Sequence, residues 1–131
     1  MKIINGGIDS VNRKAVENKS VDILMSPEKG RNYDFMKSRN SGLNQVLCKL
    51  AHNNDVAIGF DFNYVLNVKE SERSNILGRM KFNVKLCNKY KVNMYVCNSI
   101  KKMDEVRGDS DLESFGRILG MTKFEIKKFD Y

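Results

Sequence analysis

Hydrophobic and polar positions follow two different periods along this chain, and the alternation between them predicts its elements. Short apolar runs predict strands at residues 2–5, 21–25, 56–62 and 92–98. In the third run the apolar side chains fall on one face, opposite Ala57, Gly59 and Asp61. Ser26 and Pro27 stop the second run. Each strand is followed by a polar turn and most by a helical period, an order typical of parallel α/β folds.

Amphipathic spacing predicts the helices. A short polar helix is expected at residues 13–18, a second helix begins at Ser41, and a longer third helix begins at Ser71. The basic loop of residues 28–40 precedes the second helix and is the longest irregular segment. The second and third helices each carry one apolar stripe, made of Leu43, Val46, Leu47, Leu50 and Ala51, and of Ile76, Leu77, Met80, Val84 and Cys87.

A fourth helix is marked by its two ends. Ser110 and Glu113 fit the capping box that begins a helix, and Gly120 fits a stop. Its apolar stripe consists of Leu112, Phe115 and Leu119. The cationic loop before it follows a strand on the side where parallel α/β folds place functional groups, which indicates a phosphate-binding surface. Arg107 at the helix start fits two uses, holding a phosphate or pairing with Asp111, and the acidic first turn favours a structural one.

The composition indicates one domain with an excess of positive charge. The chain has 131 residues, of which 41% are hydrophobic, so residues 1–131 are expected to form a single domain around one core. Its 23 Lys and Arg against 16 Asp and Glu give a net charge of +7, which favours an anionic partner, nucleic acid first. The alternative is that the charge serves solubility alone.

The cysteines and the amino terminus favour a cytoplasmic protein. Cys48, Cys87 and Cys97 are odd in number and lack the spacing of a zinc or redox site, so we expect reduced core residues. The first residues include no apolar stretch of signal-peptide length, and no segment has the length and hydrophobicity of a membrane span. We therefore expect no membrane partner.

Residues suited to acid, base or metal chemistry are few. His52 lies near a helix end among polar residues and fits a surface position better than a general base. Asp22, Asp61 and Asp104 lie in or after strands, as metal ligands often do, but no acidic or histidine cluster accompanies them. We expect no catalytic residue, no metal and no cofactor bound by the protein. A barrel-type metal-dependent phosphoesterase or amidohydrolase with Asp61 or Asp104 as ligands is the alternative.

The helix that begins at Ser71 carries apolar residues outside its main stripe. Phe82 and Leu86 form an i, i+4 pair, and Gly78 shares their side of the helix. A glycine inside a helix costs about 0.5–1 kcal/mol, so close approach of another chain is one explanation for it. Gly78, Phe82 and Leu86 are therefore candidate contacts for a protein partner, and packing on a neighbouring helix of the same fold is the alternative.

Three motifs together resemble a known family. They are N-R-x-A-V-E-x-x-x-V-D-I-L at residues 12–24, R-x-S-G-L-N at residues 39–44 and V-R-G-x-x-D-L at residues 106–112. In this order and over nearly the whole chain, they resemble the archaeal ribonuclease P protein component 3 family, which is related to a eukaryotic subunit of the same enzyme. Asp109 differs from the family, which often has proline at that position.

The resemblance implies a partial TIM-barrel-like α/β fold with parallel strands, roughly the carboxyl-terminal half of a barrel. It also implies a non-catalytic subunit of the ribonuclease P endoribonuclease, whose RNA removes 5′ leaders from precursor tRNA with magnesium. The implied partners are that RNA, precursor tRNA through the holoenzyme, and other protein subunits, especially a small α/β protein. Family members are longer, so we expect a partner, a second fragment, or an upstream segment lost through a frameshift or a misassigned start.

The positive charge, taken with this resemblance, predicts an RNA-binding surface. The candidates are cations of the loops, the long helix and the tail: Lys29, Arg31, Lys81, Lys85, Lys101, Lys102, Arg107, Lys123, Lys127 and Lys128. Phosphate contacts of this kind give a salt-sensitive affinity with little base specificity. A pure protein-interaction module is a further alternative, in which only the side with Phe82 and Leu86 would matter.

Overall fold

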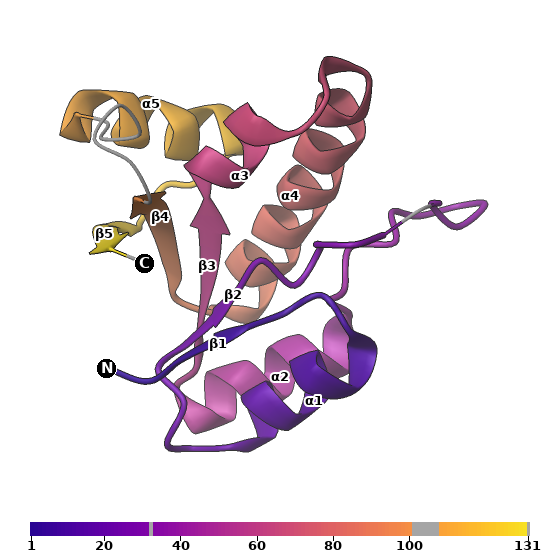
Figure 1. Ribbon diagram of the computed structural model, residues 1–131. Coiled ribbons are helices and arrows are strands. Elements are labelled where there is room, and N and C mark those ends of the chain that lie inside the picture. The colour runs from indigo at the N-terminus through magenta and orange to yellow at the C-terminus, as the bar shows by residue number, and fades with distance from the viewer. Residues whose placement is uncertain (32, 101–107, 131) are drawn as a thin grey trace.

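Five parallel strands form one sheet in which each strand lies beside the next one along the chain (Figure 1). The computed structural model describes residues 1–31, 33–100 and 108–130. Leu24 pairs with Ile4 on one side and with Ile58 on the other, which sets the register of the first three strands. The strands are β1 (Ile3–Asn5), β2 (Ile23–Met25), β3 (Ala57–Asp61), β4 (Met94–Ile100) and β5 (Glu125–Asp130).

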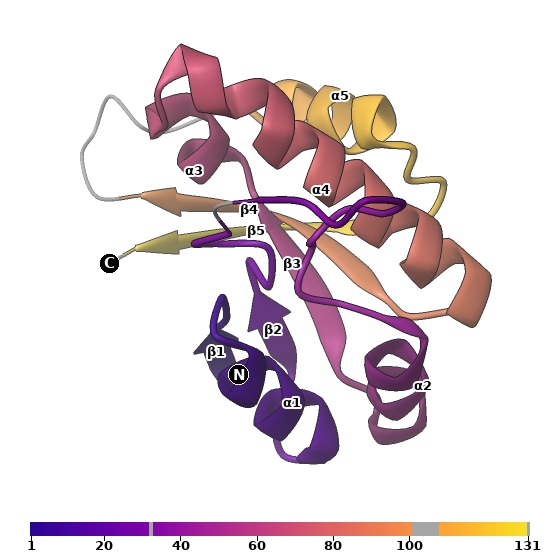
Figure 2. The same ribbon diagram turned by 90° about the vertical axis from the view of Figure 1, so that its right-hand side faces the viewer.

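The helices lie outside the sheet in the order of the chain. They are α1 (Asp9–Glu17), α2 (Gln45–Asn54), α3 (Phe62–Asn67), α4 (Glu70–Tyr90) and α5 (Asp109–Leu119). Helix α1 contacts α2, α2 contacts α4, and α4 contacts α5. Figure 2 shows α4 and α5 side by side along one side of the sheet, with α1 and α2 at its other end. This arrangement is a sector of a (β/α) barrel, so the predicted partial TIM-barrel-like α/β fold is confirmed.

Both faces of the sheet are apolar, as parallel strands require. The outer face packs against the helices, where Ile58 and Phe60 of β3 are fully buried with Met80 of α4. The alternate residues of the strands point inward and form a second buried cluster of Ile23, Met25, Ala57 and Cys97. The period of two in the strands therefore separates an outer core from the inside of the barrel sector.

The structure corrects the start of two helices. Helix α1 begins at Asp9, earlier than the polar stretch from residue 13 suggests. Helix α2 begins at Gln45, because the side-chain oxygen of Asn44 accepts a hydrogen bond from the backbone N–H of Leu47 at 2.9 Å and caps the helix. Leu43 is buried ahead of this helix, whereas Val46 is 53% exposed and does not belong to the buried stripe.

Two further elements and one cap differ from the predictions. Helix α3 and strand β5 were not predicted, because α3 is short and β5 consists mainly of charged residues. The predicted capping box is wrong: α5 begins after Gly108, and Ser110 and Glu113 lie inside the helix. In the described residues no side chain caps this end, but Gly120 ends the helix in the left-handed conformation as predicted.

Two predictions of placement can be compared directly with the structure. Cys48, Cys87 and Cys97 are buried, in agreement with their predicted role as core residues. Among the helices described here, none combines the length and apolar character needed to span a membrane.

Candidate nucleic-acid interface

Asn12 ties together the loops at the carboxyl ends of β1 and β2. Its side chain is fully buried, its oxygen accepts from the N–H of Gly7 at 3.0 Å, and its amide donates to the carbonyl oxygens of Pro27 and Gly42 at 3.1 and 3.3 Å. Gly42 has a φ of +83°, and a side chain there would overlap the carbonyl oxygen of Pro27. The first two sequence motifs therefore meet in space at the base of the basic loop.

Arg31 is directed into this loop base. Its guanidinium donates to the carbonyl oxygen of Gly7 at 2.9 Å and to the side-chain oxygen of Asn40 at 3.1 Å. It also forms an ion pair with Asp9 at 2.7 Å, and the Arg31 side chain is only 10% exposed. Arg31 thus links α1 to the basic loop, which limits how much of its charge is accessible, and RNA contact by Arg31 stays a prediction.

Asp34 fixes the outer part of the basic loop to α4. One carboxylate oxygen accepts from Nε of Arg79 and from the backbone N–H of Asn40, both at 2.9 Å, and the other accepts from Arg39 at 2.8 Å. Arg79 is buried and also donates to the carbonyl oxygen of Arg31 at 2.9 Å. Desolvation alone would raise the pKa of Asp34, but these hydrogen bonds outweigh it and lower the pKa to about 2.

Gly78 makes room for the Arg39 side chain that pairs with Asp34. A Cβ atom at Gly78 would lie 2.6 Å from a guanidinium nitrogen of Arg39, so the arginine packs directly over the glycine. The close approach that the glycine predicted is therefore made by a side chain of the same protein. Phe82 and Leu86 are half-buried, and Leu86 packs against the main core. The contact of these three residues with a protein partner stays a prediction.

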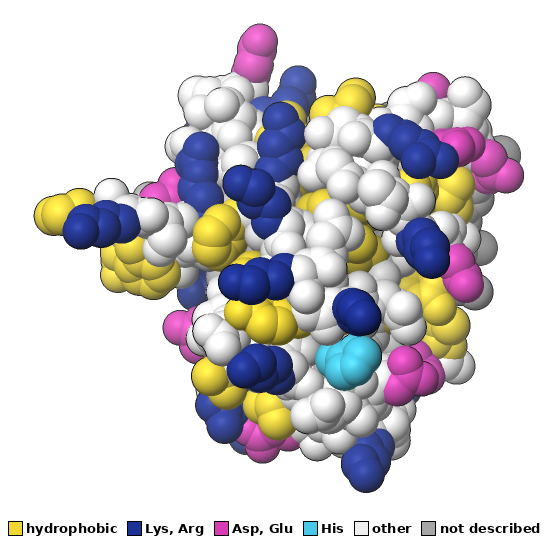
Figure 3. Space-filling model, turned by 180° about the vertical axis from the view of Figure 1, so that it is seen from behind, with side chains coloured by type: hydrophobic (Ala, Val, Ile, Leu, Met, Phe, Trp, Pro, Cys, Tyr) yellow, Lys and Arg dark blue, Asp and Glu magenta, His cyan; other side chains and the backbone are white. Residues whose placement is uncertain are grey.

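A group of lysines lies across α2 and α4, and we call it the basic face. Lys49 of α2 and Lys89 of α4 lie 5.9 and 5.4 Å from the ring centre of Tyr90. Lys85 and Lys81 precede Lys89 by one and two turns of α4. Neither α2 nor residues 73–91 contain an Asp or Glu. In Figure 3 the Lys and Arg side chains spread over this view of the molecule, with acidic side chains mainly at its margins.

The predicted RNA-binding cations whose side chains the structure describes do not form one patch. Lys81 and Lys85 belong to the basic face, whereas Lys29 is exposed after the carboxyl end of β2, 5.1 Å from the ring of Tyr64. Lys123 is exposed ahead of β5, at the opposite end of the parallel sheet. The other predicted positions, Lys101, Lys102 and Arg107, lie outside the described residues, and of Lys127 and Lys128 only the backbone, in β5, is described.

The RNA-binding residues predicted from the sequence did not include Lys49 and Lys89. The signal was present, because the absence of acidic residues from α2 and from residues 73–91 can be read directly from the chain. What the sequence does not give is the packing of α2 beside α4, which places lysines from separate segments around one tyrosine ring.

Glu28 is a further residue whose buried position the sequence did not indicate. It is 1% exposed, and in the described part of the chain neither carboxylate oxygen has a hydrogen-bond partner in another residue. Burial and the nearby charge of Asp61 raise the pKa of Glu28 to about 7, against the opposing effects of its own backbone N–H, Lys29 and Arg31. The burial of this carboxyl group therefore favours its protonated, neutral form.

The residues predicted for metal or acid–base chemistry lie apart. Asp22 accepts from the backbone N–H of Lys2 at the amino end of the sheet, whereas Asp61 caps α3 at the carboxyl end by accepting from the N–H of Asn63 at 3.1 Å. Asp104 lies outside the described residues. His52 is at the surface, with Nδ1 2.9 Å from the carbonyl oxygen of Lys91, as a structural surface histidine would be. Over the described residues, no three His, Cys, Asp or Glu side chains form a metal-binding group.

Comparison with known proteins gives consistent matches. A family model described as RNase P subunit p30 matches residues 3–129. Ribonuclease P protein component 3 of Methanosarcina mazei is 37% identical over 123 residues, which cover 94% of this chain and 48% of the relative. The protein of the same name from Methanocaldococcus jannaschii is 35% identical over 113 residues, covering 86% of this chain and 46% of the relative.

A solved structure matches as well. A chain in the cryo-EM structure of archaeal ribonuclease P with mature tRNA superimposes with a TM-score of 0.79 at 35% sequence identity. The match covers 90% of this chain and 48% of that chain. The chain thus spans about half the length of the curated relatives and of the structural neighbour that it matches.

Proposed function

This chain belongs to the RNase P subunit p30 family, and we propose that it acts as a protein subunit of ribonuclease P. In this function it assists the catalytic RNA that removes 5′ leaders from precursor tRNA. The names of its relatives and of the structural neighbour support this function. Because the chain spans about half of each match, the activity, the RNA partner and the tRNA substrate are proposals for this chain.

The basic face is the structural observation that carries the RNA-binding part of this function. Lys49, Lys81, Lys85 and Lys89 present four positive charges on two packed helices that contain no acidic residue along this surface. An RNA backbone offers evenly spaced phosphates, and each lysine that neutralises one releases condensed counterions. Such a surface binds RNA by its backbone and positions it without reading the bases.

We propose that the RNA, with magnesium, carries out the cleavage. The alternative, a metal-dependent hydrolase with Asp61 or Asp104 as ligands, is less well supported, because Asp61 serves as a helix cap and belongs to no group of three metal-ligating side chains among the described residues, outside which Asp104 lies. Phe82 and Leu86 are proposed to contact a second protein subunit, such as a small α/β protein. As a subunit of a ribonucleoprotein that matures tRNA, the protein is proposed to work in the cytoplasm.

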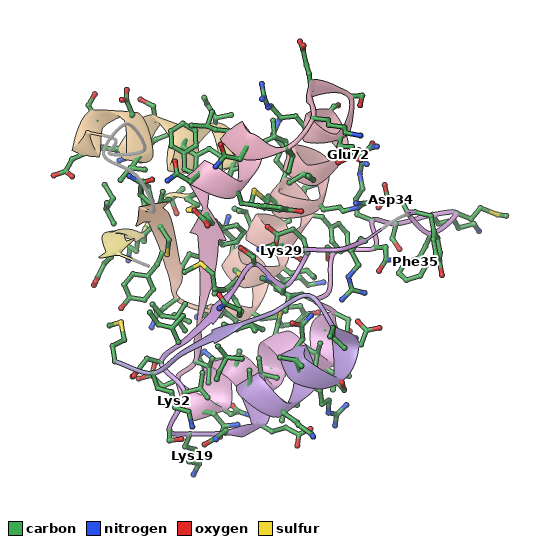
Figure 4. All side chains as sticks on the ribbon, in the orientation of Figure 1. Lys2, Lys19, Lys29, Asp34, Phe35 and Glu72 are labelled. Carbon is green, nitrogen blue, oxygen red and sulfur yellow. The ribbon has the colours of Figure 1, made fainter. Side chains whose placement is uncertain are left out.

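The experiment measures affinity for an archaeal ribonuclease P RNA as a function of salt concentration. One variant carries glutamine at three positions of the basic face: Lys81, Lys85 and Lys89. A matched control carries glutamine at three exposed lysines elsewhere: Lys2, Lys14 and Lys19. Lys2 and Lys19 lie at the end of the molecule away from the basic loop (Figure 4).

The two variants have equal net charge, so long-range attraction falls equally in both. The basic-face variant is expected to reduce the slope of log K against log salt by about 2–3, since each lost phosphate contact removes about 0.7–0.9. The control is expected to change the slope much less. Equal slopes for both variants would contradict the assignment of RNA binding to this face.

A further inference from the structure

The basic loop presents apolar side chains at its outer end. Tyr33, Phe35 and Met36 are 68%, 56% and 98% exposed. Figures 1 and 4 show this segment extending away from the body of the protein, with Phe35 near its outer part. Aromatic side chains exposed in this way do not contribute to the core, and a group of them indicates an interaction surface.

We propose that residues 33–39, which we call the projecting loop, bind unpaired bases of RNA by stacking them on Tyr33 and Phe35. The proposal rests on the RNA-binding function proposed above and names the part of the RNA that this loop recognises. Every base has a flat aromatic face, so stacking on Tyr or Phe holds bases of any sequence. In a continuous A-form helix the bases are stacked on one another, which leaves single-stranded loops, bulges and ends as the ligand.

The base of the projecting loop is held firmly. Asp34 lies between Tyr33 and Phe35 in the chain and accepts hydrogen bonds from Arg39, from Arg79 of α4 and from a backbone N–H of the loop. The positions from which the two aromatic side chains emerge are therefore fixed to a long helix. A site ordered before binding loses less conformational entropy when the ligand arrives.

The charge of the projecting loop favours RNA over an apolar protein surface. Asp34 is the one acidic residue among residues 29–54, and two arginine side chains neutralise it. Lys37 follows Met36 directly, so an exposed cation accompanies the aromatic residues. Aromatic rings beside cations match the two parts of a single-stranded nucleic acid, its bases and its phosphates.

The projecting loop is also continuous with the basic face. The Arg39 guanidinium packs over Gly78 of α4, one turn ahead of Lys81 on the same helix. A phosphate backbone bound along Lys81 and Lys85 would thus run toward the loop base. We infer that the basic face binds the backbone and the projecting loop receives bases that leave the helix.

The test compares two double variants with fluorescence-labelled RNA. Tyr33→Leu with Phe35→Leu keeps the apolar character but removes both aromatic faces, whereas Tyr33→Phe with Phe35→Tyr keeps both faces. The probes are a single-stranded 12-mer containing 2-aminopurine and a duplex of the same length. Both pairs of substitutions lie at exposed positions, and circular dichroism with thermal unfolding checks that the fold is unchanged.

The leucine variant is expected to bind the single strand about 10- to 100-fold more weakly and to lose the quenching of 2-aminopurine that stacking produces. The aromatic exchange is expected to bind as the wild type does, and duplex binding is expected to change little in either variant. The salt slope stays the same in the leucine variant, since no phosphate contact is removed.

Three results would overturn the proposal, and they differ from one another. Wild-type affinity in the leucine variant would exclude stacking at this loop. If that affinity still depended on salt, RNA binding by the basic face would be unaffected by this result. An equal loss on the duplex would show that the projecting loop does not select unpaired bases. No binding of either probe or of the ribonuclease P RNA by the wild-type chain would contradict both the loop assignment and the RNA-binding function.

Discussion

The buried carboxyl group of Glu28 makes the stability of this chain depend on pH in a direction that can be worked out. Glu28 follows β2, is buried among the residues at the carboxyl ends of the strands, and has a pKa raised from 4.5 to about 7, chiefly by burial and then by the charge of Asp61. Its own backbone N–H, Lys29 and Arg31 oppose this rise without cancelling it. The folded protein therefore holds the proton more tightly than the unfolded chain does.

The sign and the size follow from this difference. A protonated Glu28 favours the folded state, and this contribution is fully present below about pH 4.5 and is lost as the pH rises through about 7. A rise in the pKa of Glu28 from 4.5 to about 7 corresponds to about 3 kcal/mol in the free energy of unfolding. Because a domain is typically stable by about 5–15 kcal/mol, this one carboxyl group would be easy to detect.

Glu28→Gln removes the titration and keeps the shape of the side chain. Urea unfolding of both proteins at pH 4.5, 5.5, 6.5 and 7.5 gives the free energy of unfolding of each. As the pH rises across this range, the free energy of unfolding of the wild type is expected to fall by about 2–3 kcal/mol relative to that of the variant. Glu17→Gln, at an exposed position in α1, serves as the control and is expected to show little change. A difference between wild type and Glu28→Gln that does not vary with pH would refute the reasoning.

Three other substitutions follow from the ion pairs of Asp34 and from two closely packed glycines. Asp34→Asn is expected to lower the free energy of unfolding by about 1–3 kcal/mol, because the buried Arg79 loses its charged partner. That cost should shrink as the pH falls through about 2, where the wild-type carboxylate also protonates, in urea titrations at pH 2 to 5. Gly42→Ala is expected to lower the stability by at least about 2 kcal/mol, since φ is positive and backbone atoms block the side chain. Gly78→Ala should cost less, because the end of the flexible Arg39 side chain can shift, and thermal unfolding compares the two.

Much of the fold was predictable because the strands and helices keep clear periods. Ile58 and Phe60 alternate with small or polar residues in β3, and the stripe of α4 falls on buried positions such as Met80 and Val84. These patterns are local in sequence, and hydrophobic burial enforces them. Strand β5 escaped detection because lysines occupy positions within it, so its sequence reads as a charged tail.

The candidate site was predictable only in part, for a physical reason. Arg31 and Glu28 both look like exposed residues of a basic loop, yet the structure leaves little of either side chain exposed. The two terminal nitrogens of Arg31 are held by an ion pair and hydrogen bonds. Among the described residues, the Glu28 carboxylate has no partner outside its own backbone. The burial of a charged side chain depends on which segments pack around it, and this is not encoded in local spacing. Lys49 and Lys89 likewise become neighbours only through the contact of α2 with α4.

Reconstituted cleavage tests the proposal that this chain is a functional subunit of ribonuclease P. The measurement is the rate of 5′ leader removal from a precursor tRNA at low magnesium by an archaeal ribonuclease P RNA with its other protein subunits, with and without this chain. We expect a faster rate when the chain is added and no cleavage by the chain alone. An unchanged rate in an assembly that a full-length relative stimulates, or cleavage in the absence of RNA, would contradict it.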